Sequence, residues 1–133
     1  MNIGFTGTQV GMTKEQRQTF TKLCTKIDSL HHGCCIGADK QVHDIATEKK
    51  IWTVLHPPLN RSKMAIYEGS ETRRAKEYLQ RNHDIVLETD LLIATPKEFN
   101  EQLRSGTWST IRYARKMERP IIIILPNGKV IKE

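Results

Sequence analysis

The stretch from Ser105 to Leu125 reads SGTWSTIRYARKMERPIIIIL, and it decides the fold. Its apolar residues Trp108, Ile111 and Ala114 recur at helical spacing, which predicts a helix over about 108–117. Pro120 marks the boundary of that helix. The isoleucine run that follows is typical of a strand buried on both faces of a sheet. The stretch therefore predicts one helix-then-strand unit of an α/β protein.

The same alternation of strands and helices extends through the rest of the chain. Short apolar runs predict strands at 2–6, 30–35, 51–56, 91–95 and 121–125, with a small edge strand at 129–132. Helices are expected at 14–28 and 38–49, then one capped by Ser70, then a further one from Asn82 to about Glu88. The pattern predicts one domain over 1–133, with a Rossmann-like, doubly wound, mostly parallel sheet of about five strands and helices on both faces.

Composition narrows the classes of partner. The 133 residues carry a formal net charge of +6, which favours anionic partners such as nucleotides or nucleic acid. No apolar run approaches the length that spans a bilayer, and the N-terminus lacks the layout of a signal peptide. We therefore expect a cytoplasmic protein with no membrane partner.

The start of the helix near residue 106 is rich in hydroxyl groups. Ser105, Thr107, Ser109 and Thr110 lie within six residues, together with Gly106. One capping hydroxyl is enough for an ordinary helix. Free backbone N–H groups and the helix dipole favour an anion at such a start, so we expect a bound phosphate there.

Other polar segments follow the predicted strands. They are Gly7-Thr8-Gln9, Gly37-Ala38-Asp39, His56 and Thr95. In an open parallel sheet, ligands bind beyond the carboxyl ends of the strands, so these segments are expected to converge on one cleft. Arg81-Asn82 would add a phosphate-binding guanidinium, with Asn82 capping the next helix. Asp39 is expected either to cap its own helix or to contact a sugar.

The segment His31-His32-Gly33-Cys34-Cys35 resembles a metal site only in composition. Successive residues of a strand point to opposite faces, so four ligands from one extended segment cannot converge. The three cysteines, Cys24 included, do not form a disulfide framework and are expected to be reduced core residues. We expect no metal and no cofactor.

Taken in order, five motifs resemble a known group. They are Gly7-Thr8-Gln9, Gly33-x-x-x-Gly37-Ala38-Asp39, Arg81-Asn82-x-x-Ile85-Val86, Asp90-x-x-Ile93-Ala94 and Ser105-Gly106-Thr107-Trp108-Ser109-Thr110. The set is similar to the SLOG superfamily, the Rossmann-like group named after the SMF (DNA-processing protein A) and Lonely Guy proteins. The similarity covers nearly the whole chain, and the Arg-Asn and Ser-Gly-x-x-x-Thr segments are most similar to the DNA-processing protein A branch and to small stand-alone members.

This resemblance implies a nucleotide or nucleotide-derived ligand in the cleft, and a homo-oligomer. Lonely Guy enzymes cleave an N-glycosidic bond with a glutamate on the helix that follows their glycine-rich motif. The matching helix here reads Thr110-Ile111-Arg112-Tyr113, with no carboxylate. We therefore expect binding, as a sensor or sequestering protein, rather than catalysis. The alternatives are a nucleotide phosphoribohydrolase, with Glu98 or Glu101 as a substitute acid, and a single-stranded DNA-binding protein.

Overall fold

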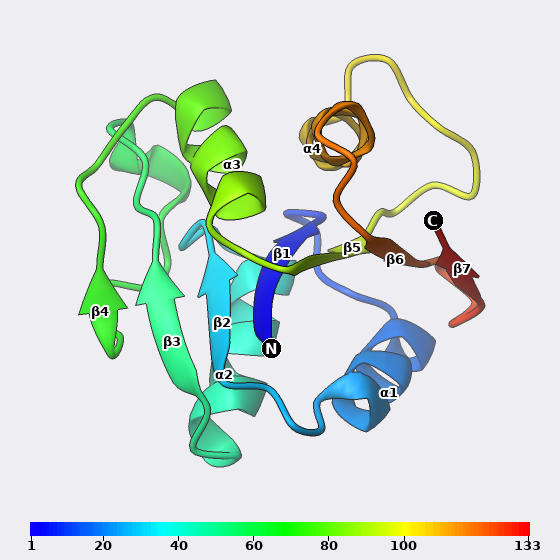
Figure 1. Ribbon diagram of the computed structural model, residues 1–133, viewed down its shortest axis with the longest axis horizontal. Coiled ribbons are helices and arrows are strands. Elements are labelled where there is room, and N and C mark those ends of the chain that lie inside the picture. Colours follow the sequence, from blue (N-terminus) through cyan, green and yellow to red (C-terminus); the bar gives the residue numbers. More distant parts are fainter.

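The computed structural model describes residues 1–133 and contains one seven-stranded sheet (Figure 1). The strand order is β4-β3-β2-β1-β5-β6-β7, and every neighbouring pair is parallel except β6 and β7. The strands are β1 (Asn2–Gly7), β2 (Ser29–His32), β3 (Trp52–Leu55), β4 (Glu71–Thr72), β5 (Leu91–Thr95), β6 (Ile121–Ile124) and β7 (Val130–Lys132). The predicted α/β class with a mostly parallel sheet is confirmed.

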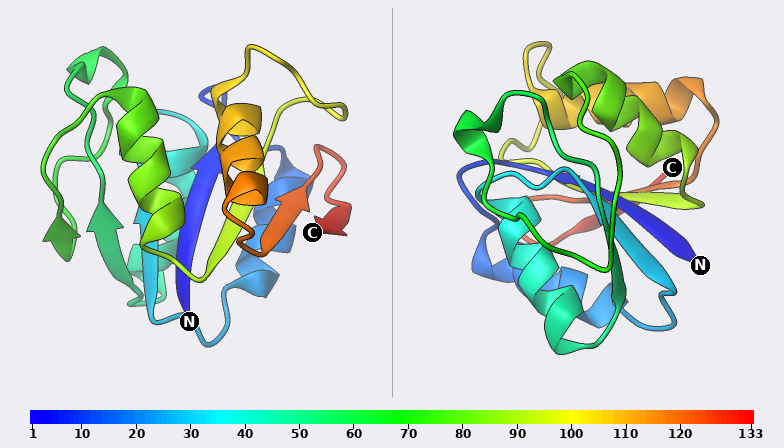
Figure 2. Two further views of the ribbon diagram at one scale, coloured as in Figure 1. Left: turned by 45° about the horizontal axis from the view of Figure 1, so that its top comes forward. Right: turned by 90° about the vertical axis from the view of Figure 1, so that its left-hand side faces the viewer.

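Helices cover both faces of the sheet, as expected. They are α1 (Lys14–Leu23), α2 (Ala38–Glu48), α3 (Tyr78–Leu87) and α4 (Gly106–Lys116), with a short 3₁₀ turn η1 (Arg61–Lys63). The helices α1 and α2 lie on one face, and α3 and α4 lie side by side on the other (Figures 1 and 2). None of them combines the length and apolar character needed to cross a membrane.

Each face of the sheet has its own apolar core. Phe5 and Phe20 meet edge to face under α1 and α2, with ring centroids 5.5 Å apart. On the other face, Trp108 and Ile111 of α4 pack with alternate isoleucines of β6. The two faces share the isoleucine run, because alternate residues of a strand point in opposite directions.

The strand order reverses direction between β1 and β5. From β1 the chain builds outward through β2, β3 and β4, and then returns to place β5 on the other side of β1. Gly7 and Thr95 are paired across this junction. The junction is the topological switch point, where open α/β sheets place their ligands.

Four expected elements differ from the structure. The first helix ends at Leu23 rather than at Asp28. The second strand ends at His32 rather than at Cys35, because Cys34 has a left-handed φ of 67°, which is not compatible with an extended strand. The expectation of two helices around Arg81-Asn82 is wrong. One helix, α3, runs through both residues, so Asn82 caps nothing, and Ser70 bonds Thr53 instead of a helix.

Two short edge strands enlarge the sheet beyond about five. The predicted strand at 129–132 is confirmed as β7, which pairs antiparallel with β6 after the Asn127-Gly128 turn. The two-residue strand β4 was not expected from the sequence, because Glu71 and Thr72 are exposed and carry no apolar alternation.

Candidate functional site

The start of α4 lies at the switch point and keeps free donors. Ser105 is the N-cap, and its Oγ accepts from the Trp108 amide at 3.2 Å. The amides of Gly106 and Thr107 precede the first full helical turn and have no partner within the helix. A Cβ added at Gly106 would meet no atom within 4 Å, and both residues line open cavities.

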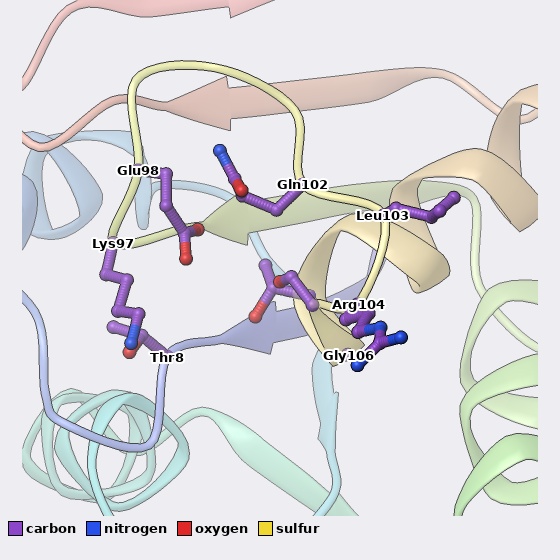
Figure 3. Close-up of a pocket in the computed structure, with 9 residues that line it drawn as sticks. Thr8, Lys97, Glu98, Gln102, Leu103, Arg104 and Gly106 are labelled. Atoms are coloured by element: carbon purple, nitrogen blue, oxygen red, sulfur yellow. The ribbon is translucent and has the colours of Figure 1, made fainter.

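One cavity, the loop cavity, lies between this helix start and the preceding loop. Its volume is about 580 Å³, and it is lined by Thr8, Lys97, Glu98, Gln102, Leu103, Arg104, Ser105, Gly106 and Thr107. The loop arches from β5 to α4, and Glu98 and Gln102 point into the space that it encloses (Figure 3). Lys97 and Arg104 bring two positive charges to this cavity, which favours an anion.

A second cavity, the arginine cavity, adjoins the first. Its volume is about 530 Å³, and Gly106 and Thr107 line both cavities. The residues around it come from β1, α2, the segment near η1 and α3; those with polar side chains are Thr6, Gln9, Asp39, Asn60, Ser62, Lys63, Tyr78, Arg81, Asn82 and Thr107. The start of α4 therefore borders both the loop cavity and the arginine cavity.

Arg81 is buried in the wall of the arginine cavity and has no carboxylate partner. It is 5% exposed, and its Nη1 donates to the carbonyl oxygens of Gly33 and His56. Its Nε donates to Asn82 Oδ1 at 2.7 Å, and its guanidinium lies over the Tyr78 ring. A Cβ at Gly33 would lie 2.4 Å from Arg81 Nη1, so only glycine leaves room for this guanidinium.

Asp39 faces the same cavity from the first turn of α2. Its Oδ2 accepts from the Cys35 amide at 3.1 Å, and α2 has no side-chain cap, so the expected capping role is not seen. Burial raises the pKa of Asp39 to about 6, against the opposing effect of the Arg81 charge. A buried carboxyl and a buried guanidinium thus share one cavity without forming a direct ion pair.

Two of the expected site residues hold the backbone of the cleft rather than line it. The Ala38 amide donates to the Thr8 carbonyl at 2.9 Å, which fixes the loop after β1 on the start of α2. Gly37 has a φ of 84°, and a Cβ there would lie 2.3 Å from the Gln9 carbonyl oxygen. These contacts position Thr8 and Gln9 at the rims of the two cavities.

Three hydroxyl residues expected at the site lie outside both cavities. Thr95 is fully buried beneath Gly7, and its Oγ1 has no hydrogen-bond partner. Thr110 Oγ1 donates to the Gly106 carbonyl at 3.0 Å within α4, and Ser109 is half-buried on the same helix. The structure brings the other nine expected residues together around the cavities: Gly7, Thr8, Gln9, Asp39, Arg81, Asn82, Ser105, Gly106 and Thr107.

The loop 97–104 contributes side chains that sequence reasoning did not place. Lys97 and Arg104 were not predicted, because a polar loop gives no periodic signal. Glu98 and Glu101, considered as substitute acids, separate in the structure. Glu98 lines the loop cavity and accepts from Trp108 Nε1 at 3.1 Å, whereas Glu101 pairs with Arg112 and Arg115 outside it.

Comparison with known proteins finds a solved structure with a similar fold. No family model matches the chain, and no curated protein matches it. Among solved structures, it is similar to the molybdenum cofactor binding protein from the phototrophic bacterium Rippkaea orientalis, at 21% sequence identity and a TM-score of 0.69. The likeness covers 92% of this chain and 75% of that one. It establishes a shared α/β fold, compatible with the Rossmann-like architecture described above.

Proposed function

We propose that this chain binds a nucleotide or a nucleotide-derived small molecule and acts as a sensor or sequestering protein. The observation that carries the proposal is the start of α4, where Gly106 and Thr107 line both cavities at the switch point. A phosphate bound there would face the free amides and the positive end of the helix dipole, while the rest of the ligand extends into a neighbouring cavity.

The charges around the two cavities suit such a ligand. Lys97 and Arg104 in the loop cavity would balance additional phosphate charge. In the arginine cavity, the Asp39 carboxyl can accept from a sugar hydroxyl or a base N–H, and the half-buried Tyr78 contributes an aromatic ring to the lining. The loop cavity thus offers positive charge, and the arginine cavity offers hydrogen-bonding and aromatic groups. A molecule with an anionic end and a hydrogen-bonding ring would match both cavities.

The comparison in fold supports a small-molecule ligand in general terms. The similar structure from Rippkaea orientalis is that of a protein that binds the molybdenum cofactor, so this architecture holds a small ligand in that protein. The SLOG-like motifs identified in the sequence point more finely to a nucleotide, and membership of that group is part of the proposal.

Titration calorimetry against nucleoside mono-, di- and triphosphates, cyclic dinucleotides and ADP-ribose tests this function. We expect one ligand class to bind, and Thr107→Val to weaken its affinity about 10- to 100-fold, since a hydrogen bond to a charged group contributes about 1.5–3 kcal/mol. The matched control is Ser109→Ala on the same helix, which lies outside both cavities. Absence of binding to every probe at millimolar concentration would refute the proposal.

One observation favours a second candidate, a nucleotide N-glycosidase. Glu98 places a carboxylate in the loop cavity close to the start of α4, although the helix itself carries none. A carboxylic acid at this position can protonate a leaving base. Release of free base from nucleoside monophosphates, abolished in Glu98→Gln and retained in Glu101→Gln, would establish this activity. No release from any monophosphate would exclude it for the substrates tested.

We also propose that the chain forms a homo-oligomer, as the family resemblance implies. Light scattering on the purified protein measures its mass directly. A mass equal to the 15.3 kDa of one chain at all concentrations tested would contradict this.

A further inference from the structure

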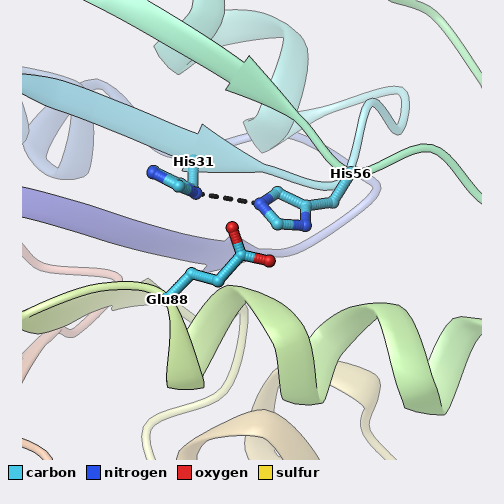
Figure 4. A group of neighbouring side chains, drawn as sticks. All are labelled: His31, His56 and Glu88. Atoms are coloured by element: carbon cyan, nitrogen blue, oxygen red, sulfur yellow. Dashed lines mark hydrogen bonds between the residues drawn. The ribbon is translucent and has the colours of Figure 1, made fainter. Parts of the chain in front are cut away.

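Three potential metal ligands converge beside the sheet, outside both cavities. His31 lies in β2, His56 directly follows β3, and Glu88 is the C-cap of α3. His31 Nδ1 is 2.9 Å from His56 Nε2, and a ligand atom of each of the three residues lies within 4.8 Å of the other two. The Glu88 carboxylate points toward the His56 ring (Figure 4).

Both histidines are held rigidly and shielded from water. They are 4% and 2% exposed, and their rings hydrogen-bond to each other. The His56 amide donates to the His32 carbonyl at 2.9 Å, which continues the pairing of β3 with β2 beyond the strand end. The hydrogen bond between the rings requires an acceptor nitrogen on one of them, so at least one ring presents a lone pair of the kind that a metal ion takes.

We propose that His31, His56 and Glu88 bind a divalent transition-metal ion of the zinc class. Two imidazoles and one carboxylate form a donor set that Zn²⁺ accepts, with water in a fourth position. Glu88 is exposed, so the site opens to solvent on the side of the carboxylate. That opening provides both an entry path and room for the water ligand.

The distances need little adjustment to hold the ion. Zn–N bonds of about 2.0–2.1 Å in a tetrahedral site place two nitrogens roughly 3.3 Å apart, slightly farther than the present 2.9 Å. The metal would replace the proton that the two rings now share. That proton would move to the outer nitrogen of the ring that carries it, which leaves both inner nitrogens free to bind the ion.

A second histidine pair in the chain provides a comparison. His32 Nε2 and His43 Nδ1 are also 2.9 Å apart, on the α2 face of the sheet, but they belong to no group of three ligands. The segment 31–35 cannot form a metal site by itself, because successive residues of a strand point to opposite faces. The proposed site takes only His31 from it and obtains the other ligands from distant parts of the chain.

Glu88 also pairs with Arg73 through Oε1, at 2.8 Å from Nε. Its second oxygen remains available for a metal, and the guanidinium would then orient the ligating carboxylate, as outer partners of metal ligands commonly do. Arg73 is also held by Glu71 at 3.1 Å, so Glu71→Gln removes a partner of the same arginine without removing a proposed ligand.

The test uses the untagged, chelator-treated chain. Zn²⁺ affinity and stoichiometry are measured by competition with a chromophoric chelator, and Co²⁺ is added as a spectroscopic probe of coordination. We expect one ion per chain and a visible d–d spectrum of four-coordinate Co²⁺. His56→Gln and Glu88→Gln should each weaken Zn²⁺ binding at least about 100-fold, because loss of an outer-shell partner alone costs 10- to 100-fold.

The controls separate the proposed site from adventitious binding. His43→Gln in the second pair and Glu71→Gln beside Arg73 should leave the Zn²⁺ affinity unchanged, and Mg²⁺ should not compete. Circular dichroism tests whether His56→Gln is folded. If His56→Gln unfolds, Glu88→Gln still tests the proposal, because it changes an exposed residue. No Zn²⁺ binding by the wild-type chain, or equal affinity in Glu88→Gln, overturns the proposal. Neither result bears on nucleotide binding, which is measured separately in the presence of chelator.

Discussion

Asp39→Asn is the substitution whose effect can be derived most directly from the structure. The wild-type carboxyl is 7% exposed, and burial raises its pKa from the usual 3.8 to about 6. The folded protein therefore holds a proton on Asp39 between about pH 4 and pH 6, where the unfolded chain has released it. Because the folded state binds more protons in this window, Asp39 makes the free energy of unfolding fall as pH rises through it.

The size of this effect follows from the shift in pKa. One pKa unit corresponds to about 1.4 kcal/mol, so complete ionisation of Asp39 in the folded state costs about 3 kcal/mol above pH 6. Asparagine resembles the protonated acid, and its side-chain oxygen can still accept from the Cys35 amide. About 0.5 kcal/mol of this is already lost at pH 4, where the unfolded chain is half ionised, so the variant should gain about 2.4 kcal/mol relative to wild type between pH 4 and pH 7.5, with the nearby Arg81 charge already included in the pKa.

Urea unfolding of both proteins at pH 4 and pH 7.5 measures this difference. Effects that do not depend on pH cancel when the two conditions are compared. The histidines with lowered pKa values are present in both proteins, and their contributions cancel as well. If the difference in unfolding free energy between wild type and Asp39→Asn is the same at both pH values, Asp39 is not the buried, proton-holding group described here.

Three further substitutions probe the framework of the cleft. Thr95→Val removes a buried hydroxyl that has no hydrogen-bond partner, so the free energy of unfolding in urea should rise by about 1–2 kcal/mol. Calorimetry should show unchanged ligand affinity. A lower free energy of unfolding would contradict this reasoning. Gly37→Ala places a Cβ against a carbonyl oxygen at a φ of 84° and should lose at least about 2 kcal/mol, whereas an unchanged urea midpoint would refute the strain. Gln16→Leu deprives the carbonyls of Pro96 and Ile124 of their donor and should cost about 2–4 kcal/mol in the same assay; a loss below 1 kcal/mol would show that water replaces the amide.

The parts of the fold that sequence reasoning predicted correctly are those with strong local signals. The isoleucines of β6 and the helical spacing of the apolar residues in α4 each leave a pattern that depends only on near neighbours. The helix α3 was misplaced because Arg81 and Asn82 look like a polar junction in sequence. In the structure, Arg81 is buried against backbone carbonyls from two other segments, and no local pattern encodes those partners.

In the candidate site, too, some features could be predicted from the sequence and others could not. The convergence of Gly7, Asp39 and the α4 start follows from parallel strands ending at one edge, so topology alone predicts it. Whether a hydroxyl lines a cavity or bonds inside its own helix depends on side-chain direction. Thr107 and Thr110 are three positions apart, yet the first lines both cavities and the second bonds Gly106.

Cys34 and Cys35 have a consequence for following this protein in solution. Both thiols are buried, Cys35 lines the arginine cavity, and burial raises the pKa of Cys34 to about 12. A thiol-modifying reagent can therefore react with them only while the segment that carries them is transiently open. A molecule that occupies the cavity should therefore slow the labelling of Cys35. The native chain thus carries its own reporter for ligand screening, without an attached dye.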